Sequence, residues 1–194
     1  MIGMAFADLI RAARSAAGYS QAEIADRADT YQPIVSGVER GKRDTGVASA
    51  AHLARAAQHR LLLIPTTHPS AVETAARIAD ALEEDSRDGA FRALLDLSDG
   101  LAKEAPLVVA ALVVAQPRST GSREWDAALS GAVAYRLRQA GLPAASWTKQ
   151  AITDDRELRA PHLHPLDDAP NVSRVPPEFL ERGILIEEGT LASV

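Results

Sequence analysis

The chain has no cysteine, few aromatic residues and no long run of apolar residues. Without cysteine it has no disulfide framework, no thiolate zinc site and no cysteine nucleophile. The longest apolar run, Leu107 to Ala115, is about half of the ~20 residues that a membrane-spanning helix needs, so we expect no membrane span. The N-terminus lacks the basic segment and following apolar segment of a secretion signal. We therefore expect a cytoplasmic protein.

The charged residues are unevenly distributed along the chain, whose formal net charge is −5. Residues 1–65 carry 8 Arg/Lys and 6 Asp/Glu, a net of +2, whereas residues 66–194 carry 13 and 20, a net of −7. This asymmetry indicates a mildly basic N-terminal domain joined to an acidic body.

The N-terminal domain begins with the pattern of two short helices. Apolar residues from Phe6 to Ala13 recur at helical spacing, and Gly18 is a typical residue for the end of such a helix. Ser20 and, three positions later, Glu23 form the capping box that starts a second helix.

Two further helices follow in the same domain. The third spans about Tyr31 to Glu39, with Pro33 in its first turn and Gly41 just beyond its end. The fourth is predicted from Val47 to Gln58. The sequence therefore predicts a mainly α fold, with a four-to-five-helix N-terminal domain.

These residues resemble the phage-repressor-type (XRE) helix-turn-helix transcriptional regulators over residues 6–60. Two patterns carry the resemblance, Ser20-Gln21-x-x-Ile24-Ala25-x-Arg27 and Gln32-Pro33-x-x-Ser36-x-x-Glu39-x-Gly41-x-Arg43. The resemblance implies sequence-specific binding of double-stranded operator DNA, with the third helix in the major groove and the second across the backbone.

The same resemblance implies roles for individual residues. Gln21 matches a phosphate-contacting glutamine, Gln32 a position whose amide bonds the edge of adenine, and Ser36 a second groove-facing position. It also implies that Glu39 pairs with Arg14 or Arg11. Arg27 is balanced between a phosphate contact and a solvated surface, and the cations after the third helix are expected near phosphates. The candidate DNA-binding residues are Gln21, Arg27, Tyr31, Gln32, Pro33, Ser36, Arg40, Lys42 and Arg43.

The third helix departs from the family pattern at two positions. Tyr31 stands where the family usually has a small capping residue, so we expect Thr30 or Asp29 to cap the helix instead. Gly37 within the helix costs about 1 kcal/mol relative to alanine. We therefore expect the order of this helix to depend on packing.

The segment His59 to Pro65 is a short apolar run without helical spacing, which indicates a buried strand or an extended joint. Pairing of such a strand across a two-fold axis would form a homodimer, and we keep this as a hypothesis.

Beyond the joint, the sequence predicts a helical body over residues 66–150 and a loop-rich C-terminal segment over residues 151–194. The body shows amphipathic patterns typical of a small helical bundle. The C-terminal segment is polar and proline-rich, with a strand predicted at Ile184 to Ile186, and we interpret it as a partner-binding region.

Parts of residues 141–184 resemble the C-terminal region of some actinobacterial helix-turn-helix proteins, including antitoxins paired with nucleotidyltransferase-type toxins. The resemblance is carried by Gly141-Leu-Pro, Ala145-Ser-Trp147-Thr and Pro-Pro-x-Phe-x-x-Arg-Gly-Ile, which ends at Ile184. It implies an autoregulating antitoxin that neutralises its toxin through the acidic part. The alternative is a ligand-responsive repressor whose body binds a small effector.

One cluster of His and Asp residues is a candidate metal or catalytic site. A His-x-His pair with nearby carboxylates has the ligand types of a divalent-metal site, but prolines bracket the histidines, and a solvated loop is the commoner explanation. No Walker loop, dinucleotide fingerprint or serine elbow is present. We expect no enzyme activity, no cofactor and no metal. The cluster consists of Asp154, Asp155, His162, His164, Asp167 and Asp168.

Overall fold

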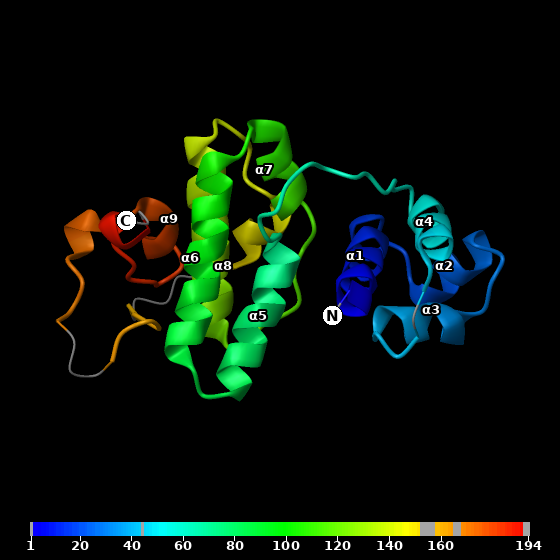
Figure 1. The fold of residues 1–194 in the computed structure, drawn as a ribbon, viewed down its shortest axis with the longest axis horizontal. Coiled ribbons are helices and arrows are strands. Elements are labelled where there is room, and N and C mark those ends of the chain that lie inside the picture. Colours follow the sequence, from blue (N-terminus) through cyan, green and yellow to red (C-terminus); the bar gives the residue numbers. More distant parts are fainter. Residues whose placement is uncertain (1, 44, 152–157, 165–167, 192–194) are drawn as a thin grey trace. The chain divides into compact units, whose positions relative to one another are not determined.

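The computed structural model describes residues 2–43, 45–151, 158–164 and 168–191, and its regular structure is almost entirely helical, as the sequence predicts (Figure 1). The chain divides into two compact units that meet at the bond between Pro65 and Thr66. No described helix is long and apolar enough to cross a bilayer.

The N-terminal unit consists of α1 (Ile2–Ala16), α2 (Gln21–Arg27), α3 (Gln32–Glu39) and α4 (Val47–Ala56). The end residues act as predicted, because Gly18 and Gly41 adopt left-handed φ angles of 74° and 65° just beyond α1 and α3. The helices enclose one apolar core, whose largest buried members are Ile10, Ile24, Val35, Val38 and Leu53.

The joint after α4 forms neither a helix nor a strand in this chain. Leu62 and Leu63 are almost fully exposed, at 83% and 103% of their reference areas. The predicted buried strand is therefore wrong for the single chain, whereas the alternative of an extended joint agrees with the structure (Figure 1). The apolar pattern of these residues is real, but no described part of the chain covers them.

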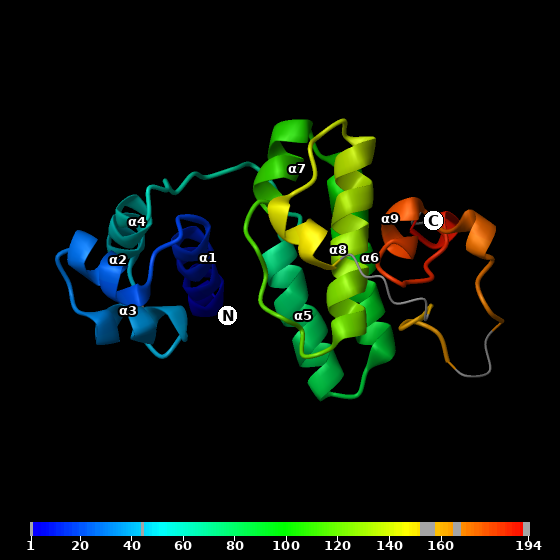
Figure 2. The ribbon, with the colours of Figure 1, turned by 180° about the vertical axis from the view of Figure 1, so that it is seen from behind.

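The C-terminal unit is a helical bundle built around α8 (Arg123–Gln139). Residues 128–137 of α8 are buried without interruption, so this part of the helix is covered around its whole circumference. It contacts α5, α6, α7 and α9, and Figure 2 shows it at the front of the bundle. The other elements are α5 (Ala71–Glu83), α6 (Arg87–Lys103), α7 (Pro106–Val113), η1 (Ser146–Ala151), η2 (Val172–Arg174), α9 (Pro177–Leu180) and η3 (Glu188–Leu191).

The described part of the C-terminal segment packs into the same core as the bundle. Phe179 is fully buried, and its ring lies so close to Gly131 of α8 that a Cβ there would be 2.7 Å from the ring. The strand predicted at Ile184 to Ile186 is reduced to a single parallel bridge between Arg159 and Ile184. The described residues therefore form one bridge at this place and not the predicted strand.

Two buried arginines fasten this segment to the bundle. Arg136 of α8 donates from Nε to Ser98 Oγ (2.9 Å) and from Nη2 to the carbonyl of Leu191 (2.9 Å). Arg182, which is 5% exposed, donates to Ser130 Oγ (2.8 Å) and to two backbone carbonyls (2.6 Å each). Burial lowers the pKa of Arg182 from its ordinary value. The charge is stabilised by these hydroxyl and carbonyl dipoles and by Glu181, whose Oε2 lies 3.7 Å from Nη1.

Replacement of Arg182 by alanine should lower the free energy of unfolding of the C-terminal unit by about 2–4 kcal/mol, because it leaves buried acceptors without a donor and opens a cavity. Both tryptophans lie in this unit, so urea unfolding followed by tryptophan fluorescence measures it selectively. Arg174→Ala is the matched control, because this side chain is 72% exposed. Equal stability of the two variants would contradict the assigned role.

Candidate nucleic-acid interface

The helix-turn-helix consists of α2, a four-residue turn and α3. Ser20 caps α2 as the sequence predicts: its Oγ accepts from the Glu23 amide (3.2 Å), and its own amide donates to Glu23 Oε2 (2.7 Å). These hydrogen bonds with Ser20 lower the pKa of Glu23. In the turn, Asp29 adopts a left-handed φ of 45°, which redirects the chain into α3.

The start of α3 differs from the prediction. The N-cap residue is Tyr31, and no side chain accepts a hydrogen bond there from the described helix amides, so capping by Thr30 or Asp29 is wrong. Pro33 lies in the first turn as predicted, where its missing N–H leaves one fewer amide to satisfy. Tyr31 is 77% exposed at this end of the helix.

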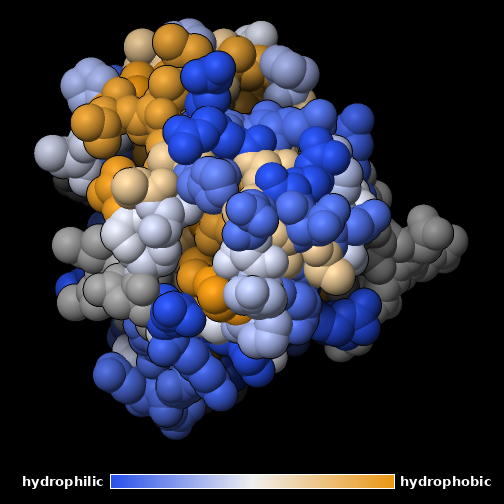
Figure 3. All heavy atoms as spheres, turned by 90° about the vertical axis from the view of Figure 1, so that its right-hand side faces the viewer, coloured by the Kyte–Doolittle hydropathy of each residue, from blue (hydrophilic) through white to orange (hydrophobic). Residues whose placement is uncertain are grey.

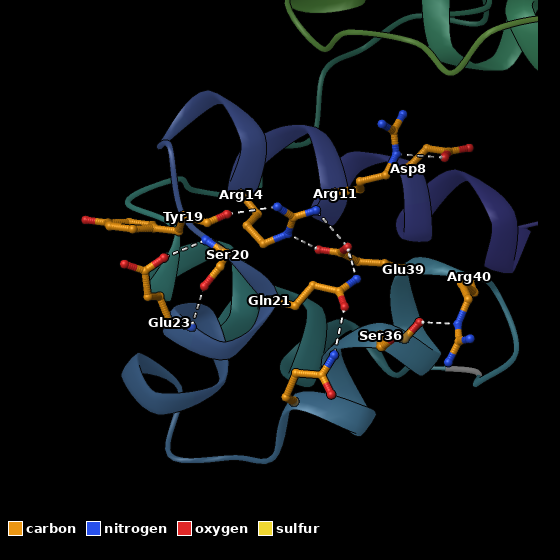
Figure 4. Close-up of polar contacts among 11 residues, drawn as sticks. Asp8, Arg11, Arg14, Tyr19, Ser20, Gln21, Glu23, Ser36, Glu39 and Arg40 are labelled. Atoms are coloured by element: carbon orange, nitrogen blue, oxygen red, sulfur yellow. Dashed lines mark hydrogen bonds and ion pairs between the residues drawn. The ribbon is translucent and has the colours of Figure 1, made fainter.

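A buried carboxylate organises the centre of the unit (Figure 4). Glu39 of α3 is only 2% exposed, and it pairs with Arg14 of α1 through two contacts, from Nε to Oε1 (2.7 Å) and from Nη2 to Oε2 (3.0 Å). Nη1 of Arg14 donates to the carbonyl of Tyr19 (2.8 Å). Of the two predicted partners of Glu39, Arg14 makes these contacts, and Arg11 Nε lies 3.8 Å from Asp8.

From this carboxylate a chain of hydrogen bonds leads to the protein surface (Figure 4). Gln21 Nε2 donates to Glu39 Oε2 (2.8 Å), and Gln32 Nε2 donates to Gln21 Oε1 (3.0 Å). Gln32 is exposed at the first position of α3. The structure thus brings together two of the predicted site residues, Gln21 and Gln32, in one hydrogen-bond chain that ends at Glu39.

The cations predicted after α3 lie on the surface. Arg40 folds back along its own helix and donates from Nε to the carbonyl of Ser36 (3.1 Å). Lys42 and Arg43 are exposed, and their backbone amides donate to the carbonyl of Gly37 (3.0 and 3.2 Å), whereas within the described residues neither side chain has a hydrogen-bond or ion-pair partner. Ser36 is half-buried and lies one turn after Gln32 on the same side of α3.

Arg27 lies at the opposite end of α2 from Gln21 and does not join this group. Its guanidinium stacks over the Tyr19 ring at 4.5 Å, and Nε donates to the carbonyl of Ala56 in α4 (3.0 Å). It also borders a shallow depression of about 360 Å³ with His52, Arg55 and Ala56. The sequence patterns predicted neither this packing of Arg27 against α4 nor the stacking of its guanidinium on Tyr19.

The candidate metal cluster lies partly outside the described residues, because Asp154, Asp155 and Asp167 are not among them. Of the others, His162 stacks on Phe91 with ring centroids 4.5 Å apart. His164 Nε2 lies 3.9 Å from Asp88. Within the described ranges, no three His, Asp or Glu side chains come together as a metal site.

No family model, curated protein or solved structure matches the chain. The functional argument therefore depends on the residues and on their geometry.

Substitution of Arg14 or Glu39 by alanine should each destabilise the N-terminal unit by about 3 kcal/mol, because each leaves a buried charge without its partner. The double variant should lose clearly less than the sum of the two, because no unpaired charge remains. Hydrogen-exchange mass spectrometry of the full chain measures the unit separately from the body.

The exposed carboxylate of Asp26 on α2 offers the control for this comparison of single and double variants. Asp26→Ala should change the stability by less than about 0.5 kcal/mol. Strictly additive losses for Arg14 and Glu39 would show that their pairing does not stabilise the unit.

Proposed function

We propose that the N-terminal unit binds double-stranded DNA sequence-specifically and that the chain regulates transcription. The hydrogen-bond chain from buried Glu39 through Gln21 to exposed Gln32 is the observation that supports this most directly. In helix-turn-helix proteins the first residues of the second helix contact base edges in the major groove. Gln32 occupies that position in α3.

The hydrogen-bonding capacity of Gln32 supports the same proposal. A glutamine amide has two N–H donors and one carbonyl acceptor. Gln21 uses one N–H of Gln32, and the remaining N–H and carbonyl suit the N7 acceptor and the N6 donor of adenine. Gln21 is therefore a positioning residue for Gln32, and its own second N–H is available for a phosphate.

The residues around α3 provide the further contacts of this proposal. Ser36 follows Gln32 by one helical turn on the groove side, and Tyr31 and Pro33 border the start of the helix. Lys42 and Arg43, just beyond its end, supply positive charge for the backbone.

Gln32→Ala should weaken binding to the cognate site by about 1–3 kcal/mol and leave non-specific binding almost unchanged, because only a base contact is lost. The cognate site is obtained by selection from a random DNA pool, and affinities are measured by fluorescence anisotropy. Ser15→Ala, at an exposed position of α1, is the control. An equal loss on both kinds of DNA would contradict base contact by Gln32.

Lys42→Ala should weaken all sequences alike and reduce the slope of log K against log salt by about one, as expected for one lost phosphate contact. Lys149→Ala, which removes an exposed lysine of the C-terminal unit, should leave the slope unchanged. An unaltered slope for Lys42→Ala would remove this residue from the phosphate contacts.

For the acidic body we propose a protein partner, with the chain acting as the antitoxin of a toxin–antitoxin pair. The turn between α5 and α6 and the helix ends beside it expose four carboxylates, Glu83, Glu84, Asp85 and Asp88, and thereby favour a basic partner. A stoichiometric complex with a toxic neighbouring gene product would support this proposal. A small ligand that changes operator affinity, without such a complex, would support the repressor alternative instead.

A further inference from the structure

Helix α7 has no charged side chain and no polar one. Val109, Leu112 and Val113 on its inner side are buried in the core of the C-terminal unit. On its outer side Leu107 is 79% exposed and Val114 is 72% exposed. Val114 keeps helical backbone angles (φ −65°, ψ −36°), so these two residues lie two turns apart on one face. We call Leu107, Ala110, Ala111 and Val114 the outer face of α7.

The solvent-facing sides of the neighbouring helices, unlike that of α7, carry charged residues. α5 and α6 place charged residues toward solvent, and Arg77 and Asp96 form an ion pair between them (2.6 Å). A helix that is apolar all round is normally covered on every side. Figure 3 shows that hydrophobic atoms gather on the surface in the upper part of that view. On the outer face of α7, Leu107 and Val114 are thus exposed, and the two alanines between them are partly buried.

We propose that the outer face of α7 binds the outer face of α7 in a second copy of the chain, with the two helices antiparallel. The face is self-complementary, because a two-fold axis between Ala110 and Ala111 sets Leu107 opposite Val114 of the second copy. The two alanines at the crossing allow the helix axes to approach to about 8 Å.

The charge distribution of the unit favours a second copy over a basic partner at this face. The outer face is uncharged, so a basic protein gains no ion pair from it. The acidic turn between α5 and α6 lies at the far end of α6 from α7 (Figure 1). Pairing through α7 therefore joins the uncharged surfaces and keeps the acidic turns of the two copies apart.

The experiment is sedimentation velocity of the full chain over a range of concentrations. The wild type should be a dimer, and Leu107→Glu or Val114→Lys should each raise the dissociation constant about 100-fold, because each buries two unpaired charges. The double variant L107E/V114K sets Glu opposite Lys twice and should restore the dimer. The restored dimer should weaken as salt increases, unlike the wild type.

Val172→Glu is the control, because Val172 is also an exposed apolar residue of the C-terminal unit, at 47%. It should leave the dimer intact, and circular dichroism should show that all the variants are folded. A monomeric wild type, or a double variant that stays monomeric, would overturn the proposal. So would loss of the dimer with Leu62→Glu or Leu63→Glu but not with the α7 variants, which would assign the dimer to the joint.

This inference does not rest on DNA binding, since sedimentation is measured without DNA. A monomer that still discriminates between DNA sequences would overturn the dimer alone, and a dimer that does not bind DNA would overturn the proposed function alone.

Discussion

A carboxylate that is withdrawn from water must have a cation and hydrogen-bond donors around it, and in the N-terminal unit this requirement falls on Glu39. Arg14 of α1 and Gln21 of α2 meet it. Three helices are therefore positioned relative to one another by one polar centre, in addition to their apolar core. The surface residue Gln32 is oriented by this centre, because its side-chain amide donates a hydrogen bond to Gln21 Oε1.

The C-terminal unit depends on the same physical rule with the charges reversed. Arg136 and Arg182 bring guanidinium groups into the core, and hydroxyl and carbonyl oxygens surround them. Because these carbonyls belong to segments without long helices, the arginines give order to a stretch of chain that has little regular structure of its own. Burial around α8 then supplies the apolar part of the stability.

The sequence predicted those features that depend on local chemistry. Helix ends follow from the capping box and from glycine, and the family resemblance implied that Glu39 pairs with Arg14 or Arg11, of which the structure shows Arg14. Features that depend on distant partners were not predictable. The bond between Gln21 and Gln32 joins two helices at no regular spacing. Likewise, the apolar pattern of the joint does not reveal that Leu62 is exposed in the single chain, and the described residues at Ile184 form one bridge, to Arg159, instead of the predicted strand.

The hydrogen bond between Gln21 and Gln32 has a consequence for the entropy of the proposed complex with DNA. A free glutamine side chain samples many rotamers, and fixing it at an interface costs about 0.5–1.5 kcal/mol. In this chain the rotamer of Gln32 is restrained before any ligand arrives. Part of the ordering cost is then incurred when the protein folds, and association with a base begins from a side chain that already points in one direction.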